Sequence, residues 1–146
     1  MRRITFTLLI IISFSSCNNS SRQKSPVELK MELKRQEQSN VRQYLSLDNV
    51  FINKNKIKEA GIFSSAKYDG HLITGKVKNT ATIARFKDIK LRLQLFSKTK
   101  TLISEKTYVF YEYYEPNSIK NFSLKINPPI AMKSYNISVV SAESTQ

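Results

Sequence analysis

The segment Ile89-Lys-Leu-Arg-Leu-Gln-Leu-Phe-Ser97 decides the fold, because apolar and polar residues alternate along it. The four aliphatic residues at odd positions from Ile89 to Leu95 would point to one face of an extended chain. Lys90 and Arg92 would point to the opposite face. This period of two predicts a β-strand with one buried face and one solvated face.

Segments with strand character lie on both sides of this strand. Residues 72–78 alternate in the same way, and further strands are predicted at 46–52, 60–67, 101–113, 119–126 and 135–141. Turn-forming residues separate several of them, at Asp69-Gly70, Asn79-Thr80, Glu115-Pro-Asn-Ser118 and Asn127-Pro-Pro129. Seven strands without a helical segment among them predict an all-β fold, an antiparallel β-sandwich, with a small barrel as the alternative.

The C-terminal two-thirds of the chain resembles the immunoglobulin-like β-sandwich modules of envelope proteins, especially the FxLYD type. The resemblance rests on Ile73-Thr-Gly-Lys-Val-Lys-Asn79, on the segment 89–97, and on a proline turn before Phe122-Ser-Leu-Lys-Ile126. Leu93-Gln-Leu-Phe-Ser97 stands where these modules have Phe-x-Leu-Tyr-Asp. The resemblance implies an immunoglobulin-like antiparallel sandwich of about seven strands. It brings no catalytic residues with it.

A helix is predicted ahead of the sandwich, beginning at Ser25-Pro-Val-Glu28. The serine and the glutamate form a capping box, and proline occupies the first helical position. Strong helix formers continue to Gln38. The apolar residues from Val27 to Leu33 also alternate with charged ones, which is a strand pattern, but the caps and the composition favour a helix.

The first residues, Met1-Arg-Arg-Ile-Thr-Phe-Thr-Leu-Leu-Ile-Ile-Ile-Ser-Phe-Ser-Ser-Cys17, indicate export. The apolar run has about eleven residues, whereas a membrane-spanning helix needs roughly 20, so we expect a signal segment. It resembles the signal peptides of bacterial lipoproteins, in which a cysteine is acylated on sulfur and becomes the new N-terminus. The lipobox would be Phe14-Ser-Ser-Cys17, and the alternative is a conventional cleavage site with an unmodified Cys17.

Four parts are therefore expected: a signal peptide at 1–16, the lipidated cysteine and a tether at 17–25, a helix and connector at 26–43, and the β-sandwich domain at 44–146. Loss of Arg2 and Arg3 with the signal peptide lowers the formal net charge from +13 to +11. The whole mature chain resembles small uncharacterised lipoproteins of Gram-negative envelopes. This implies a protein held on a membrane by acyl chains on Cys17, expected at the outer membrane and facing the periplasm.

Residues suited to catalysis are sparse. The single histidine, His71, follows the predicted turn at Asp69-Gly70 and is interpreted as a solvated turn residue. Glu112 and Glu115 flank a tyrosine cluster and are interpreted as isolated surface charges. Three glycines in the whole chain provide no glycine-rich phosphate loop. We therefore predict a protein that is not an enzyme, with no catalytic residue, metal or cofactor.

Two groups of residues are candidates for binding. The segment 108–114 places aromatic residues on both faces of one strand, so Tyr111 and Tyr113 are candidate contacts for a partner protein, with rim tyrosines of no binding role as the alternative. Four basic residues form the second group: Lys76, Lys78, Lys90 and Arg92. They form one patch if their two strands pair as a hairpin, but they can fall on opposite sheets under immunoglobulin topology.

The sequence thus predicts a lipid-anchored envelope protein with a non-catalytic interaction or structural role. The alternative is a binding module for acidic glycan, lipopolysaccharide or anionic lipid headgroups. Nucleic acid is not expected as a partner despite a pI near 9.9, because an exported protein seldom meets it.

Overall fold

The computed structural model describes residues 24–145, so the predicted signal peptide and Cys17 lie outside the described residues. The described chain begins with two helices, α1 (Pro26–Ser39) and α2 (Val41–Tyr44). Six strands follow in this part of the chain: β1 (Leu45–Lys58), β2 (Lys67–Asn79), β3 (Phe86–Phe96), β4 (Leu102–Tyr114), β5 (Ser118–Ile126) and β6 (Ser134–Ser144).

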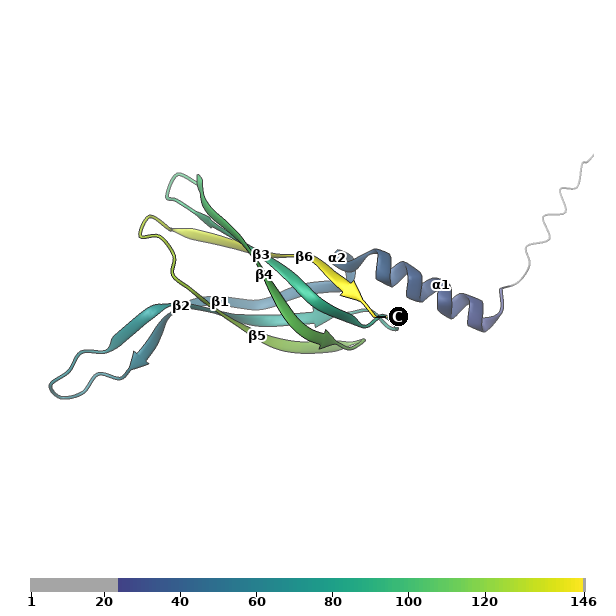
Figure 1. Cartoon of the computed structure of the whole chain (residues 1–146), viewed down its shortest axis with the longest axis horizontal. Coiled ribbons are helices and arrows are strands. Elements are labelled where there is room, and N and C mark those ends of the chain that lie inside the picture. Colours follow the sequence, from purple (N-terminus) through teal and green to yellow (C-terminus); the bar gives the residue numbers. More distant parts are fainter. Residues whose placement is uncertain (1–23, 146) are drawn as a thin grey trace, which may run out of the picture.

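The strands form two antiparallel sheets of three strands each (Figure 1). The first sheet has the order β1-β2-β5 and the second the order β4-β3-β6. In immunoglobulin domains the first, second and fifth strands likewise share one sheet, and the third and sixth share the other. The predicted all-β antiparallel sandwich is confirmed, with six strands in the described residues instead of the expected seven or so, and β4 lies beside β3 in the second sheet. The barrel alternative is wrong, because β1 to β6 pair as two separate sheets.

The core lies between the two middle strands, β2 and β3. The aliphatic side chains from Ile89 to Leu95 are at most 5% exposed, as their alternation predicts. Ile73 and Val77 face them from β2 and are fully buried. Burial of one Leu or Ile side chain contributes about 1.5 to 3 kcal/mol, so this row supplies a large part of the stability.

Gly75 and Phe122 are paired across β2 and β5 and belong to the same core layer. A Cβ atom at Gly75 would lie 2.7 Å from Cε1 of Phe122, so the glycine leaves the space that the ring fills. The ring then makes an edge contact with Phe110 of the second sheet, at 5.6 Å between centroids. Glycine is therefore needed at this position for packing between the sheets.

The predicted strand at 60–67 is wrong. Most of this segment is the exposed turn between β1 and β2, closed by a bridge between Gly61 and Ser64. Its apolar residues have no neighbouring strand to cover them. The predicted turn at Asp69-Gly70 is also wrong, because both residues lie inside β2. Gly70 has φ +71°, and this left-handed residue interrupts the regular pairing without ending the strand.

The predicted helix at the N-terminal side is confirmed as α1. Ser25 accepts a hydrogen bond from the backbone of Glu28, and the Glu28 carboxylate accepts one from the backbone of Ser25. The helix projects from one end of the sandwich, opposite to the end of the β1–β2 hairpin (Figure 1). No helix within residues 24–145 has the length and apolar character that crossing a membrane requires.

Glu37 attaches the C-terminal part of α1 to the sandwich. Its side chain is 1% exposed and accepts four hydrogen bonds of 2.7 to 2.9 Å from the β2–β3 connection. The donors are Thr82, through its backbone and its hydroxyl, and the backbone of Ile83 and Ala84. Burial raises the pKa of Glu37, but hydrogen bonds from Thr82, Ala84 and Ile83 outweigh it and leave that pKa below its ordinary value.

Candidate binding surfaces

The structure divides the four predicted basic residues between the two sheets. Lys76 and Lys78 point outward from β2 in the first sheet, and Lys90 and Arg92 lie on β3 in the second. Because β2 and β3 do not pair, the four residues do not form one patch. Arg92 is half-buried, and its guanidinium lies 3.9 Å from the Glu105 carboxylate, so its charge is partly neutralised.

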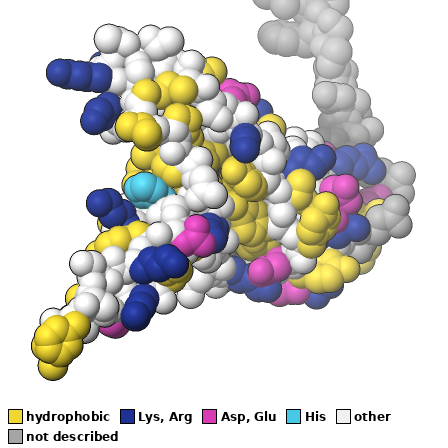
Figure 2. Space-filling model, turned by 60° about the vertical axis from the view of Figure 1, so that its left-hand side comes forward, with side chains coloured by type: hydrophobic (Ala, Val, Ile, Leu, Met, Phe, Trp, Pro, Cys, Tyr) yellow, Lys and Arg dark blue, Asp and Glu magenta, His cyan; other side chains and the backbone are white. Residues whose placement is uncertain are grey.

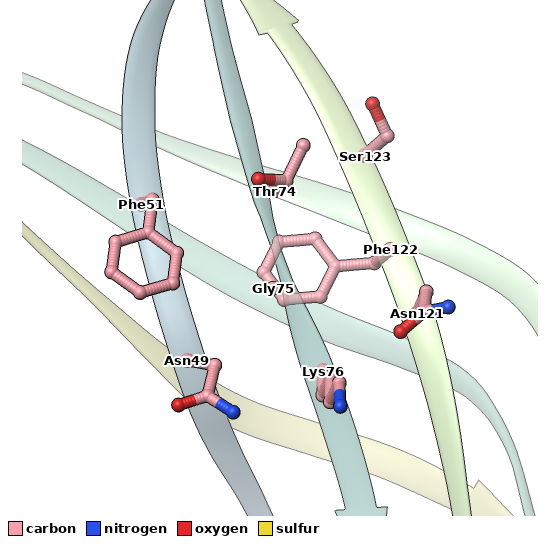
Figure 3. Close-up of a pocket in the computed structure, with 8 residues that line it drawn as sticks. All are labelled: Asn49, Phe51, Thr74, Gly75, Lys76, Asn121, Phe122 and Ser123. Carbon is pink, nitrogen blue, oxygen red and sulfur yellow. The ribbon is translucent and has the colours of Figure 1, made fainter.

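Lys76 lines a hollow of about 600 Å³ on the outer face of the first sheet (Figure 3). The other residues around it come from all three strands: Asn49, Phe51, Thr74, Gly75, Asn121, Phe122 and Ser123. Gly75 and Phe122 belong to the core layer, whereas the others offer amides, hydroxyls, one ammonium group and one exposed aromatic ring. Such a set of groups is suited to a polar, ring-shaped ligand that carries negative charge.

A β-bulge shapes this hollow. Asp48 pairs with Lys76 and Phe51 pairs with Thr74, so β1 has two residues opposite the single Gly75. Asn49, with φ +50°, takes up the extra length. Phe51 is 59% exposed, although aromatic side chains of this size are mostly buried. Bulges often redirect side chains beside binding sites, and here the bulge lies where Asn49 and Phe51 line the hollow.

The two predicted tyrosine contacts lie on the outer face of the second sheet. Lys87 pairs with Tyr113 and Ile89 with Phe110, so β4 has an extra residue in this interval and both Tyr111 and Tyr113 face outward. Tyr111 is 80% exposed. The guanidinium of Arg85 stands over the Tyr113 ring at 5.1 Å.

The acidic residues beside this cluster are paired with cations. Glu112 lies 3.6 Å from the Lys120 ammonium group, and Glu115 forms an ion pair with Arg85. Between them Tyr114 is buried, and burial together with the negative charge of Glu112 raises its pKa to about 12. Both glutamates are thus exposed members of ion pairs rather than isolated charges.

His71 is not the solvated turn residue that the sequence suggested. It lies within β2, is half-buried, and pairs with Lys54 on one side and Ile126 on the other. Its Nδ1 atom is buried without a hydrogen-bond partner among the described residues. No group of three metal-ligating residues occurs in the part of the chain that the structure describes.

Sequence reasoning missed the exposed end of the β1–β2 hairpin, where Ile62 and Phe63 are 93% and 101% exposed. The signal was present, because Gly61 before them and Ser64-Ser65 after them favour a turn. It also missed the buried Asn79, whose Nδ2 donates to three carbonyl groups at 2.9 to 3.1 Å, those of Ala84, Tyr114 and Glu115. Asn79 thereby joins the end of β2 to the second sheet.

No protein-family model matches this chain, and no curated protein sequence matches it significantly. Among solved structures, the Salmonella enterica trimeric lipoprotein SadB is similar, with 13% sequence identity and a TM-score of 0.41. The similarity covers 78% of this chain and 68% of that chain. It carries no functional inference at this level. The assignment to the FxLYD type stays a prediction.

Proposed function

We propose that this protein is a lipid-anchored protein of the bacterial cell envelope with a non-catalytic interaction role. The observation that carries the proposal is the segment from Met1 to Cys17, in which two arginines, a short apolar run and two small residues precede the only cysteine. Acyl chains on Cys17 would hold the domain on the outer membrane, facing the periplasm.

The start of the fold supports this arrangement. Helix α1 begins at Pro26, nine residues after Cys17. A chain of that length reaches at most about 30 Å, so an acylated Cys17 would keep the domain close to its bilayer. The exposed surfaces of both sheets would then be presented to other molecules of the envelope.

Metabolic labelling with a palmitate analogue tests the anchor. The wild-type protein should incorporate the label, and Cys17→Ala should incorporate none and remain unprocessed. Ser16→Ala is the matched control, because it keeps a small residue in the lipobox and should be labelled like the wild type. Equal labelling of the Cys17→Ala variant would rule out the proposed attachment site.

A second candidate function is binding of acidic glycan, such as the phosphorylated sugars of lipopolysaccharide. The observation in its favour is that Lys76 and the exposed ring of Phe51 line one hollow together with two side-chain amides. Aromatic faces stack on sugar rings, amides bind hydroxyl groups, and an ammonium group pairs with phosphate. Within the described residues, Lys76 forms no ion pair that would compete with such a ligand.

Binding of purified lipopolysaccharide core oligosaccharide, measured by calorimetry at low and high salt, tests this candidate. Phe51→Ala and Lys76→Gln should each weaken binding, and salt should reduce the contribution of the lysine. Lys90→Gln is the matched control, because it removes the same charge from the other sheet. A protein partner would instead depend on the exposed tyrosines, so Tyr111→Ala and Tyr113→Ala would then have the larger effect.

A further inference from the structure

The β1–β2 hairpin extends beyond the body of the sandwich as a two-stranded arm. Strand β5 pairs with β2 only from His71 to Asn79, so residues 54–70 have no third strand beside them. We call this segment the arm. Figure 1 shows it projecting from the end of the molecule that lies opposite α1.

The end of the arm is apolar. Gly61 and Ser64 exchange two backbone hydrogen bonds, of 2.8 and 3.2 Å, and close a tight turn. Ile62 and Phe63 occupy the two positions between them and are almost wholly exposed. Turns of this kind ordinarily carry polar residues or glycine, so two large apolar side chains are unusual there. They point to a surface that becomes covered when the protein is in place.

Glu59 and Asp69 of the arm form ion pairs with Lys56 and Lys125, and the basic residues behind the apolar end are lysines (Figure 2). The arm carries four of them: Lys54, Lys56, Lys58 and Lys67. Lys58 and Lys67 face each other at the last residue pair of the β1–β2 ladder, and neither forms an ion pair with a described residue. Like charges opposite each other on paired strands destabilise a hairpin. An anion bound between them would remove that repulsion.

We propose that the arm is a membrane-contacting element, with Ile62 and Phe63 inserted among the lipids and Lys58 and Lys67 on anionic headgroup phosphates. The membrane is the bilayer that carries the acyl chains of Cys17, so this part of the inference rests on the proposed function. The domain would lie along that bilayer, attached through the acylated N-terminus at one end and through the arm at the other.

The shape and size of the arm favour a bilayer over a protein partner. A stable protein interface buries about 800 Å² on each side, whereas the arm ends in a convex turn with two large apolar side chains. A bilayer adapts to a convex end and places phosphates behind the inserted side chains, where the lysines lie. The small contact is sufficient because an acyl anchor in the same membrane gives the arm a high effective concentration.

A tryptophan reporter tests this contact, since the chain contains no natural tryptophan. The acylated full-length protein with Phe63→Trp is reconstituted into vesicles of equimolar phosphatidylglycerol and phosphatidylcholine, with brominated lipid as the quencher. The fluorescence should shift to shorter wavelength and be quenched by the brominated lipid. A Tyr111→Trp protein is the matched control, because Tyr111 is also largely exposed but lies on a sheet face away from the arm, and its fluorescence should change little.

Two further experiments test the lysines separately from the inserted apolar side chains. Lys58→Gln with Lys67→Gln, or vesicles of phosphatidylcholine alone, should reduce quenching of the Phe63→Trp reporter. Unchanged quenching under both conditions would overturn the role of the lysines.

Absence of quenching in protein that floats with the vesicles would overturn the membrane contact itself. The membrane contact would also be overturned if the Phe63→Trp reporter were protected from a water-soluble quencher but not quenched by brominated lipid. That result would mean that a protein covers the arm. Failure of the proposed acyl anchor gives a different result from failure of the arm contact. Without acyl chains on Cys17, the anchor would not carry the protein along when the vesicles float.

Discussion

Replacing Glu37 by alanine should destabilise the fold, because this side chain attaches α1 to the sandwich. The change leaves four donors without their acceptor, but the backbone and hydroxyl of Thr82 are exposed and regain water. The backbone N–H groups of Ile83 and Ala84 lie in half-buried and buried residues and would stay unsatisfied. At about 1 to 3 kcal/mol for each of these two groups, the expected loss in the free energy of unfolding is about 2 to 6 kcal/mol.

Urea denaturation of residues 24–146 would measure this loss. The free energy of unfolding of a small domain is only about 5 to 15 kcal/mol, so the urea concentration at the midpoint should fall clearly. The slope of the free energy against urea concentration should stay nearly constant. Glu32→Ala is the matched control: it removes a carboxyl group from the same helix that makes no hydrogen bond to the sandwich, and it should cost less than about 0.5 kcal/mol. Equal losses for the two variants would refute the role given to Glu37.

The same carboxylate predicts a pH dependence. Because the pKa of Glu37 is lower in the folded protein than its ordinary value of 4.5, its ionised form stabilises the folded state above that value. The contribution should be lost as the pH falls from 4.5 through the lower pKa of the folded state. Glu37→Gln should have a flatter stability profile over this range, and a profile identical to that of the wild type would contradict the assignment.

The remaining predictions concern the core and one buried tyrosine. Leu93→Asp should lower the free energy of unfolding by several kcal/mol, because it places a carboxylate in the core. Arg92→Gln on the outer face should lower it far less. Similar melting temperatures for the two variants would show that the strand register is wrong. Gly75→Ala should lower stability by about 1 to 3 kcal/mol, because its Cβ would meet the Phe122 ring, and an unchanged midpoint in urea would contradict that packing. Since the pKa of Tyr114 is raised to about 12, its neutral form stabilises the fold below pH 10 and that contribution is lost between pH 10 and about 12, a loss that Tyr114→Phe should remove in alkaline unfolding curves.

Local patterns were sufficient to predict most of the fold. The alternation from Ile89 to Leu95 identified β3 and its buried face, and the capping box at Ser25 and Glu28 identified the start of α1. The segment 60–67 was misread because alternation describes one strand at a time and does not reveal whether a neighbour exists. Ile62 and Phe63 are apolar, yet they lie in a turn where no strand can cover them.

The candidate surfaces depend on contacts between distant residues, and the sequence predicted them less well. Lys76 and Arg92 are close in the chain, but the pairing of β2 with β5 and of β3 with β6 places them on different sheets. In the sequence, Glu37 does not differ from the other charged residues of the helix, because its hydrogen-bond partners lie 45 to 47 residues further along the chain. The hollow at Phe51 likewise needs a bulge in β1, and its one local signal is Asn49, since asparagine tolerates a positive φ.

Mass spectrometry of the N-terminal peptide of the protein purified from membranes tests the central claim most directly. The account predicts that the mature chain begins at Cys17 and that the sulfur atom of this residue carries a diacylglyceryl group. An N-terminal peptide with an unmodified Cys17, or with a cleavage site elsewhere, would contradict it.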